Sequence, residues 1–190
     1  MRELEERILR DGKVLPGNVL KVGSFLNQQL DVPFMMRMGR EIAEMYRDER
    51  VTKILTVEAS GIALAVAAAA AMEVPVVFAK KNRSSNVSGN VYTAPVHSYT
   101  HNKDFTIVVS ADYIKKTDKL LIVDDFLANG EALRGLLSIA GQAGAPVAGC
   151  AVAIEKGFQG GGDALRADGI RVDALATVAQ MSDSGLTFRK

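Results

Sequence analysis

The most constraining feature of this sequence is the alternation of short apolar runs with helical segments along most of the chain. Four apolar runs predict buried strands, at residues 53–57, 74–79, 119–123 and 147–155. Predicted helices at 61–72 and 131–143 follow the first and third of these runs. Strands that alternate with helices of this length favour βαβ units, which build a mostly parallel sheet with helices on both faces. The pattern therefore predicts an α/β fold.

The two ends of the chain extend this pattern. A helix is predicted over residues 2–10, and a second one begins after Asp31, a favourable cap, and runs to about residue 48. At the other end, a helix at 163–167 and a strand at 170–177 close the predicted domain. A single hydrophobic core can serve about 250–300 residues, so residues 1–190 are predicted to form one domain.

Residues 80–112 interrupt the alternation. They begin with a basic and polar stretch, 80–86, and continue as two alternating runs, 91–99 and 105–109. These runs predict a flexible hairpin that is inserted between two parallel strands along the chain. Long excursions from a compact domain commonly serve as lids or binding loops, so we expect a lid over about residues 84–110.

The overall charge and the single cysteine exclude several classes of protein. The chain has 23 Lys and Arg against 22 Asp and Glu, whereas nucleic-acid binders usually carry a strongly basic face. The longest low-polarity window, 61–72, is too short for a bilayer, which needs about 20 apolar residues. Cys150 lies in an apolar run, which predicts a buried thiol without an internal disulfide. We expect a soluble, cytoplasmic protein with no nucleic-acid partner and no membrane segment.

Polar residues gather where the predicted parallel strands end, which is the edge of such a sheet where ligands bind. These ends are Glu58–Gly61, Lys80–Arg83 and Asp124–Asp125. The last is the most informative, because a short loop of small residues and a helix follow its two carboxylates. A helix N-terminus suits a phosphate, and paired acids suit vicinal hydroxyls with or without Mg²⁺, so together they indicate a ribose phosphate. The alternative is an ordinary strand–turn–helix junction in which the aspartates only cap backbone amides.

Residues 121–132 resemble the motif with which type I phosphoribosyltransferases bind 5-phosphoribosyl-1-pyrophosphate (PRPP): an apolar run, two acids, a short loop, a glycine and a helix. Nearly the whole chain shares the resemblance, and its details are similar to the branch of the family that uses xanthine. The segments that carry this second likeness are 19–22, 24–27, 57–63, 76–81, 124–130 and 154–158. The loop Ala128–Ala132 departs from the frequent Thr-Gly-Gly-Thr form, which leaves its individual phosphate contacts open.

The resemblance implies both a fold and a reaction. The fold is a central, mostly parallel sheet flanked by helices, with the inserted hairpin and a small N-terminal hood over about residues 1–35. The reaction transfers the 5-phosphoribosyl group from PRPP to a 6-oxopurine, with xanthine the first choice, and forms XMP and pyrophosphate in purine salvage. The alternatives are a guanine or hypoxanthine transferase or, with less support, a purine- or PRPP-sensing regulator on the same fold.

The resemblance also implies a role for each residue that would contact PRPP. Asp124 and Asp125 are the predicted catalytic pair and would face the ribose hydroxyls. The 5′-phosphate would be held by Ala128, Asn129, Gly130, Glu131 and Ala132, and the pyrophosphate by Ala59, Ser60 and Gly61 with Lys80 or Lys81. Mg²⁺ would come mainly with PRPP, with Asp124 or Asp125 as its candidate protein ligands. A plain exposed charge run is the alternative interpretation of the two lysines.

The purine would lie between the fourth predicted strand and the hood. Lys156 would meet the 6-oxo group, and Leu20 would contact the base. Asn27 would lie near the 2-oxo group that distinguishes xanthine from hypoxanthine. The simpler interpretations are a solvated Lys156 and an Asn27 that caps a helix or a turn. Because the family is typically dimeric, the resemblance also implies a homodimer.

Overall fold

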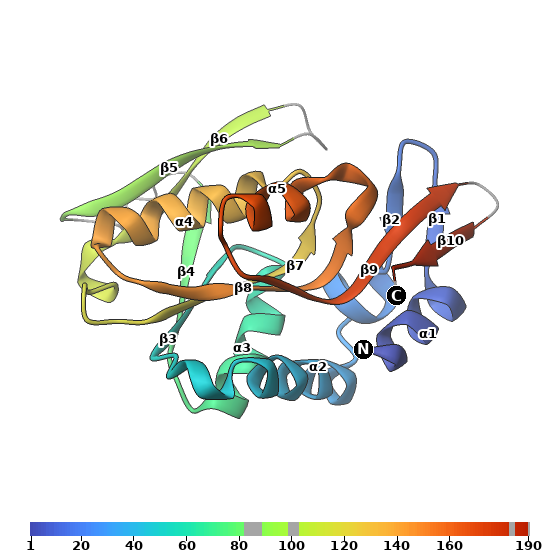
Figure 1. The fold of residues 1–190 in the computed structure, drawn as a ribbon, viewed down its shortest axis with the longest axis horizontal. Helices are drawn as coiled ribbons and strands as arrows, with labels where there is room; N and C mark the ends of the chain where they lie inside the picture. Colours follow the sequence, from blue (N-terminus) through green and yellow to red (C-terminus); the bar gives the residue numbers. More distant parts are fainter. Residues whose placement is uncertain (82–88, 99–102, 183–184, 190) are drawn as a thin grey trace.

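The computed structural model of the chain describes residues 1–81, 89–98, 103–182 and 185–189. These residues form a sheet with the strand order β10-β9-β8-β7-β3-β4-β6-β5 and a separate small hairpin, β1-β2 (Figure 1). The strands of the sheet are β3 (Lys53–Val57), β4 (Val76–Lys81), β5 (Val91–Ser98), β6 (Lys103–Ser110), β7 (Leu120–Leu127), β8 (Val147–Lys156), β9 (Val172–Ser182) and β10 (Gly185–Phe188). In the centre of the sheet, the neighbouring strands β9-β8-β7-β3-β4 run parallel, as predicted. The pairs β10-β9, β4-β6 and β6-β5 are antiparallel.

Helices cover both faces of the central sheet (Figure 1). One face carries α2 (Val32–Met45) and α3 (Gly61–Met72), and the other carries α4 (Glu131–Ala143) and α5 (Gly161–Ala167). On β7, Leu121 joins the buried cluster of α2 and α3, while Leu120 and Ile122 join the cluster of α4. Successive side chains of a strand point to opposite faces, so a strand buried on both sides needs an unbroken apolar run.

The N-terminal segment packs at one end of this sheet (Figure 1). It consists of α1 (Arg2–Asp11), β1 (Lys13–Leu15), β2 (Val19–Lys21) and a π-helical turn (Gly23–Asn27). The predicted first helix is confirmed, and so is the cap of the second, because the Asp31 carboxylate accepts a hydrogen bond from the N–H of Phe34. α2 ends at Met45, earlier than predicted, and a short 3-10 turn, Arg47–Glu49, follows it.

β7 is longer than the sequence pattern predicts. Its apolar run predicts a strand that stops before Asp124, but the strand continues to Leu127. The reason lies in its pairing: β3 pairs with β7 only as far as Ile122, whereas the ladder to β8 continues to Leu127, opposite Glu155. The two acids therefore lie within a strand, along the stretch that β3 no longer borders.

The C-terminal part also differs from the prediction of one strand over 170–177. β9 runs from Val172 to Ser182, and β10 returns antiparallel beside it. Gln180, Ser182 and Thr187 interrupt the apolar pattern of this hairpin, which is only partly buried. Its stability comes from pairing with the sheet and not from a local apolar run, so pattern analysis does not detect it.

The inserted hairpin is confirmed, and the structure shows where it docks. β5 and β6 pair antiparallel, and β6 continues the sheet by pairing with the end of β4. On α4, the side-chain amide of Gln142 donates to the carbonyl of Thr93 (2.8 Å) and accepts from its N–H (3.2 Å), which ties β5 to that helix. The parts of the predicted lid at 84–88 and 99–102 lie outside the described residues.

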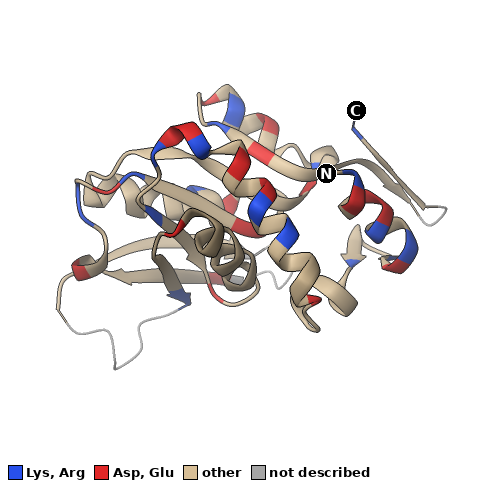
Figure 2. Cartoon of the chain, turned by 90° about the horizontal axis from the view of Figure 1, so that it is seen from below, with Lys and Arg blue, Asp and Glu red and all other residues tan. Residues whose placement is uncertain are grey.

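The helices and the charged residues of the structure agree with what the composition predicts. None of the described helices is long and apolar enough to cross a membrane. Positively and negatively charged residues are interspersed along several of the helices (Figure 2), in keeping with the net charge of +1. Cys150 is a free, buried thiol as predicted, and burial raises its pKa to about 12, so it stays protonated near neutral pH.

Candidate active site

Asp124 and Asp125 form the buried centre of the candidate site. Each residue is only 6% exposed. The Asp124 carboxylate accepts a hydrogen bond from the backbone N–H of Asp125 at 2.9 Å. Burial raises the pKa of Asp124 well above its ordinary range, and the nearby charge of Asp125 raises it further. The site therefore favours the protonated form of Asp124 more strongly than water does.

Asp125 connects two segments that lie far apart in the sequence. Its carboxylate accepts hydrogen bonds from the hydroxyl of Ser60 (3.0 Å) and from the side-chain amide of Asn27 (3.1 Å). Ser60 belongs to the turn between β3 and α3, and Asn27 ends the π-helical turn of the N-terminal segment. The structure thus brings three predicted site residues together, and the cap of α2 is Asp31 and not Asn27.

The turn between β3 and α3 lies directly against the acids. Its Glu58–Ala59 peptide bond is cis, and Gly61 is the first residue of α3. A Cβ on Gly61 would lie 2.5 Å from Oγ1 of Thr56 and 2.6 Å from Oδ1 of Asp124, so a side chain has no room there. The Thr56 hydroxyl is buried and has no hydrogen-bond partner among the described residues. The predicted pyrophosphate segment is therefore packed onto the acid pair.

A pocket of about 190 Å³ lies over the loop between β7 and α4. Its lining residues are Lys81, Val96, His97, Phe105, Phe126, Leu127, Ala128, Asn129, Gly130, Glu131, Ala132 and Leu133. Gly130 has a positive φ of 90° and precedes α4, and among the described residues no side chain caps the first turn of this helix. Its first N–H groups therefore remain available for an anion, which a helix N-terminus favours.

Lys81 brings a positive charge to this pocket. Its ammonium lies 5.4 Å from the centre of the Phe105 ring, and its backbone N–H donates to the Glu58 carboxylate at 2.5 Å. Lys80 does not line the pocket, because successive side chains of β4 point to opposite faces. Of the two predicted lysines, the structure therefore places Lys81 beside the loop.

Lys156 ends β8 and reaches the N-terminal segment. Its ammonium donates to the backbone carbonyl of Asn18 (2.9 Å) and lies 5.7 Å from the centre of the Phe126 ring. Burial lowers the pKa of Lys156, so this side chain is not a fully solvated strand-end residue. Leu20, on β2, is 6% exposed and belongs to the hydrophobic cluster under α2 and α3.

Phe126 is a site residue that the sequence pattern does not single out. It follows the acids on β7, lines the pocket over the loop between β7 and α4, and lies beside the ammonium of Lys156. Phe126 therefore lies between the loop that follows β7 and the side chain of Lys156. The available signal was its position, an aromatic ring directly after two acids at the end of an apolar strand.

The strand ends of the parallel sheet thus bring together an acid pair, a glycine-bearing loop before a helix and a nearby lysine. Residues 27–165 match the family model described as the phosphoribosyl transferase domain, and the chain belongs to this family. The match includes the acid pair, the loop, Lys81 and Lys156.

Two relatives are similar to the chain over nearly its whole length. It is 52% identical over 188 residues to the xanthine phosphoribosyltransferase of Lactobacillus delbrueckii subsp. bulgaricus, which covers 99% of this chain and 100% of the relative. It is 53% identical over 192 residues to the xanthine phosphoribosyltransferase of Bifidobacterium longum, which covers 100% of both chains.

Among solved structures, the fold is similar to that of the APRTase from Giardia lamblia complexed with 9-deazaadenine. That match has a TM-score of 0.78 at 20% identity and covers 92% of this chain and 97% of the other. The adenine phosphoribosyltransferase from Rhodothermus marinus matches with a TM-score of 0.75 at 21% identity, over 93% and 99% of the two chains. At such identities the likeness concerns the fold alone.

Proposed function

We propose that this chain transfers the 5-phosphoribosyl group from PRPP to a 6-oxopurine, with xanthine the preferred base, and forms XMP and pyrophosphate. The observation that carries the proposal is the buried pair Asp124–Asp125 beside a pocket lined by Ala128–Ala132 and Lys81. The full-length similarity to two xanthine phosphoribosyltransferases, at 52% and 53% identity, supports the choice of base.

Three segments divide the binding of PRPP in this proposal. The loop Ala128–Ala132 binds the 5′-phosphate through N–H groups at the start of α4, with Lys81 beside it. Ala59–Gly61 binds the pyrophosphate through backbone amides, helped by Lys80 or Lys81. Asp124 and Asp125 accept hydrogen bonds from the ribose hydroxyls and offset the positive charge that develops on the sugar as pyrophosphate leaves C1.

The purine is held from the other side of the ribose. Lys156 donates to the 6-oxo group, which replaces the carbonyl of Asn18 as its acceptor. Asn27 donates to the 2-oxo group once the ribose hydroxyls have taken its place on Asp125. Phe126 offers its ring to the base as an apolar surface, and Leu20 supports the N-terminal segment above it.

Mg²⁺ fits the chemistry of this site. The ion is commonly bound through one or two carboxylates together with the phosphates of a substrate. In the part of the chain that the structure describes, no cluster of three or more His, Cys, Asp or Glu side chains could hold a metal. Asp124 and Asp125 supply two adjacent carboxylates for an ion that arrives with PRPP. Bound there, Mg²⁺ would neutralise negative charge on the departing pyrophosphate.

The remaining features of the proposal concern the assembly. The chain forms one domain, with a hood over about residues 1–35 and a lid over about residues 84–110. Closure of the lid excludes water from the reacting sugar. We also propose that the enzyme is a cytoplasmic homodimer. Sedimentation at micromolar concentration should give a dimer, and a species of monomer mass would refute this part.

The reaction is tested by a spectrophotometric assay of PRPP and Mg²⁺ with each of xanthine, guanine, hypoxanthine and adenine. We expect the highest kcat/KM with xanthine and no turnover of adenine, which lacks the 6-oxo group. A higher kcat/KM with guanine or hypoxanthine would replace xanthine as the preferred base. PRPP binding without turnover of any base would instead identify a sensing regulator and refute the enzymatic proposal.

A further inference from the structure

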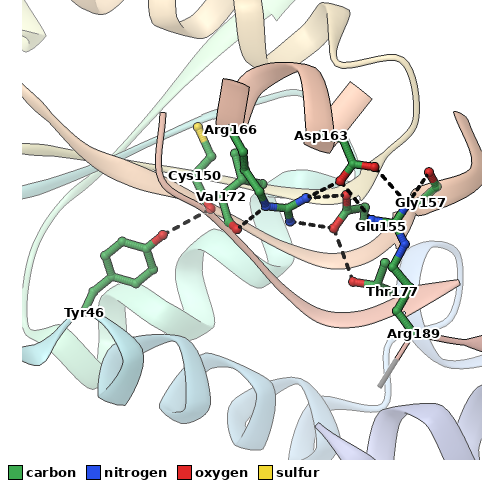
Figure 3. Close-up of polar contacts among 9 residues, drawn as sticks. All are labelled: Tyr46, Cys150, Glu155, Gly157, Asp163, Arg166, Val172, Thr177 and Arg189. Carbon is green, nitrogen blue, oxygen red and sulfur yellow. Dashed lines mark hydrogen bonds and ion pairs between the residues drawn. The ribbon is translucent and has the colours of Figure 1, made fainter. Parts of the chain in front are cut away.

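A network of ion pairs surrounds the buried carboxylate of Glu155 (Figure 3), the residue that precedes Lys156 on β8. The site described above does not use this network. Glu155 is 1% exposed, and Arg166 donates to both of its carboxylate oxygens, from Nη1 at 2.9 Å and from Nη2 at 2.8 Å. The hydroxyl of Thr177 donates to the same carboxylate at 3.2 Å. Arg166 also donates from Nε to the carbonyl of Val172 at 3.1 Å. One buried carboxylate therefore links β8, α5 and β9.

A second arginine holds the residue on the other side of Lys156. Nη2 of Arg189 donates to the carbonyl of Gly157 at 2.9 Å, and the same guanidinium binds both oxygens of Asp163, at 2.8 and 2.9 Å. Asp163 also accepts from Arg166 at 3.2 Å, so the two arginines share one network (Figure 3). A Cβ on Gly157 would lie 2.8 Å from Nε of Arg189, so glycine allows the guanidinium to pack against the backbone.

Lys156 thus extends from a backbone that is fixed on both sides. Glu155 and Lys156 point to opposite faces of β8, the first into the network and the second toward Phe126 and the carbonyl of Asn18. A lysine ammonium sits on a long, flexible stem. A small change in the backbone of Lys156 becomes a large displacement of the ammonium at the end of this stem. The backbone therefore has to be held in place if the ammonium is to meet one oxygen of a ligand.

Stability of the fold is a weak explanation for this network. Glu155 is buried, so its carboxylate loses its hydration, whereas the side chain of Arg166 is 36% exposed and solvent screens its charge. Such an ion pair adds little to folding compared with apolar residues of the same size. The network instead fixes the orientation of Glu155, because a planar guanidinium binds a carboxylate with two parallel hydrogen bonds.

We infer that Arg166 and Arg189, acting through Glu155 and the carbonyl of Gly157, are positioning residues for Lys156 and hence for the 6-oxo group of the purine. The inference rests on the proposed function for the identity of the ligand. The hydrogen bonds of Arg189 run to Gly157 and Asp163, whereas α5, which carries Arg166 and Asp163, packs against the loop Ala128–Ala132 at Gly161. Loss of Arg189 should therefore affect binding of the base more than binding of PRPP.

Arg189→Met is the test variant, because its side chain is 41% exposed and its loss leaves the Glu155–Arg166 pair in place. Arg171→Met is the matched control: Arg171 is also 41% exposed and also pairs with acids, but it lies just before β9 and pairs with Glu49 and Asp173. Arg189→Met should raise the KM for xanthine about 5- to 20-fold, as a weakened hydrogen bond between Lys156 and the 6-oxo group predicts, with a smaller change in the KM for PRPP. Arg189→Lys should recover part of the loss, and Arg171→Met should change neither KM.

The inference is overturned if Arg189→Met leaves the KM for xanthine unchanged, raises both KM values equally, or behaves like Arg171→Met. A measurement without substrate separates this outcome from failure of the proposed function. After reductive ¹³C-methylation, the NMR signal of Lys156, assigned with Lys156→Arg, should titrate at a higher pH in Arg189→Met than in the unaltered chain, because the released side chain meets more water. An unshifted titration would refute positioning even if the chain converts xanthine, and a shifted one would support it even if xanthine is not turned over.

Discussion

Gly61→Ala adds one methyl group where the turn after β3 meets the acid pair. The methyl carbon would lie 2.5 Å from Oγ1 of Thr56 and 2.6 Å from Oδ1 of Asp124, whereas ordinary van der Waals contact begins at 3.4 Å. The two neighbours would have to move by about 0.9 Å and 0.8 Å, although both are buried. Overpacking of this kind costs about 1–3 kcal/mol. In a domain of this size, that cost lowers Tm by about 2–12 °C.

The same displacement should reach the chemistry, because Asp124 hydrogen-bonds the backbone of Asp125. A misplacement of about 1 Å at a reacting group can cost about 100-fold in rate, so we expect kcat/KM for PRPP to fall about 10- to 100-fold. Thermal unfolding by circular dichroism and initial rates at varied PRPP measure the two effects. Gly141→Ala is the control: the new Cβ has no atom within 4 Å on an exposed face of α4, and alanine there should add up to about 1 kcal/mol of stability.

Each outcome of this comparison is informative. A Gly61→Ala protein with unaltered Tm and unaltered kcat/KM for PRPP would show that the turn and the acid pair are not in tight contact, and the steric argument would fail. A lower Tm with unaltered kcat/KM would make the turn structural only and would remove Ala59–Gly61 from the proposed pyrophosphate site.

Three further predictions concern the charged and amide groups of the site. Asp124→Asn should raise Tm near pH 7–8. The pKa of Asp124 is raised in the folded state, so the contribution of this carboxyl group to stability is present below its ordinary pKa of about 3.9 and is lost as the pH rises through the folded-state pKa. The gain in Tm should therefore shrink toward pH 4. Asp125→Asn should lower kcat about 10²- to 10⁴-fold with an unaltered circular dichroism spectrum, and a rate within threefold of the unaltered chain would leave Asp125 only its pairing with Ser60 and Asn27. Asn27→Ala should lower kcat/KM for xanthine about 5- to 150-fold and hardly change kcat/KM for hypoxanthine. Lys156→Ala should lower kcat/KM for both bases. Equal losses for xanthine and hypoxanthine in Asn27→Ala would contradict contact between Asn27 and the 2-oxo group.

Local features of the sequence were sufficient for most elements of the fold. The helix predicted over 131–143 has these bounds in the structure, because its start after Gly130 and its apolar periodicity are properties of neighbouring residues. The strand at 53–57 and the helix at 61–72 follow for the same reason. The motif around Asp124 and Asp125 was equally local, and it was enough to indicate a ribose phosphate before any tertiary contact was known.

Only the tertiary structure decided which of these residues meet. Asn27 contacts Asp125 across 98 positions of the sequence, and Lys156 reaches Asn18 across 138. The continuation of β7 to Leu127 and the return of β10 depend on the ladders that β8 and β9 offer them. By itself, the sequence therefore determined the order of strands and helices and the motif that would bind a ribose phosphate. Strand order and register determine which side chains meet in the site. Both depend on pairing between distant segments, so they cannot be inferred from the pattern of any one segment.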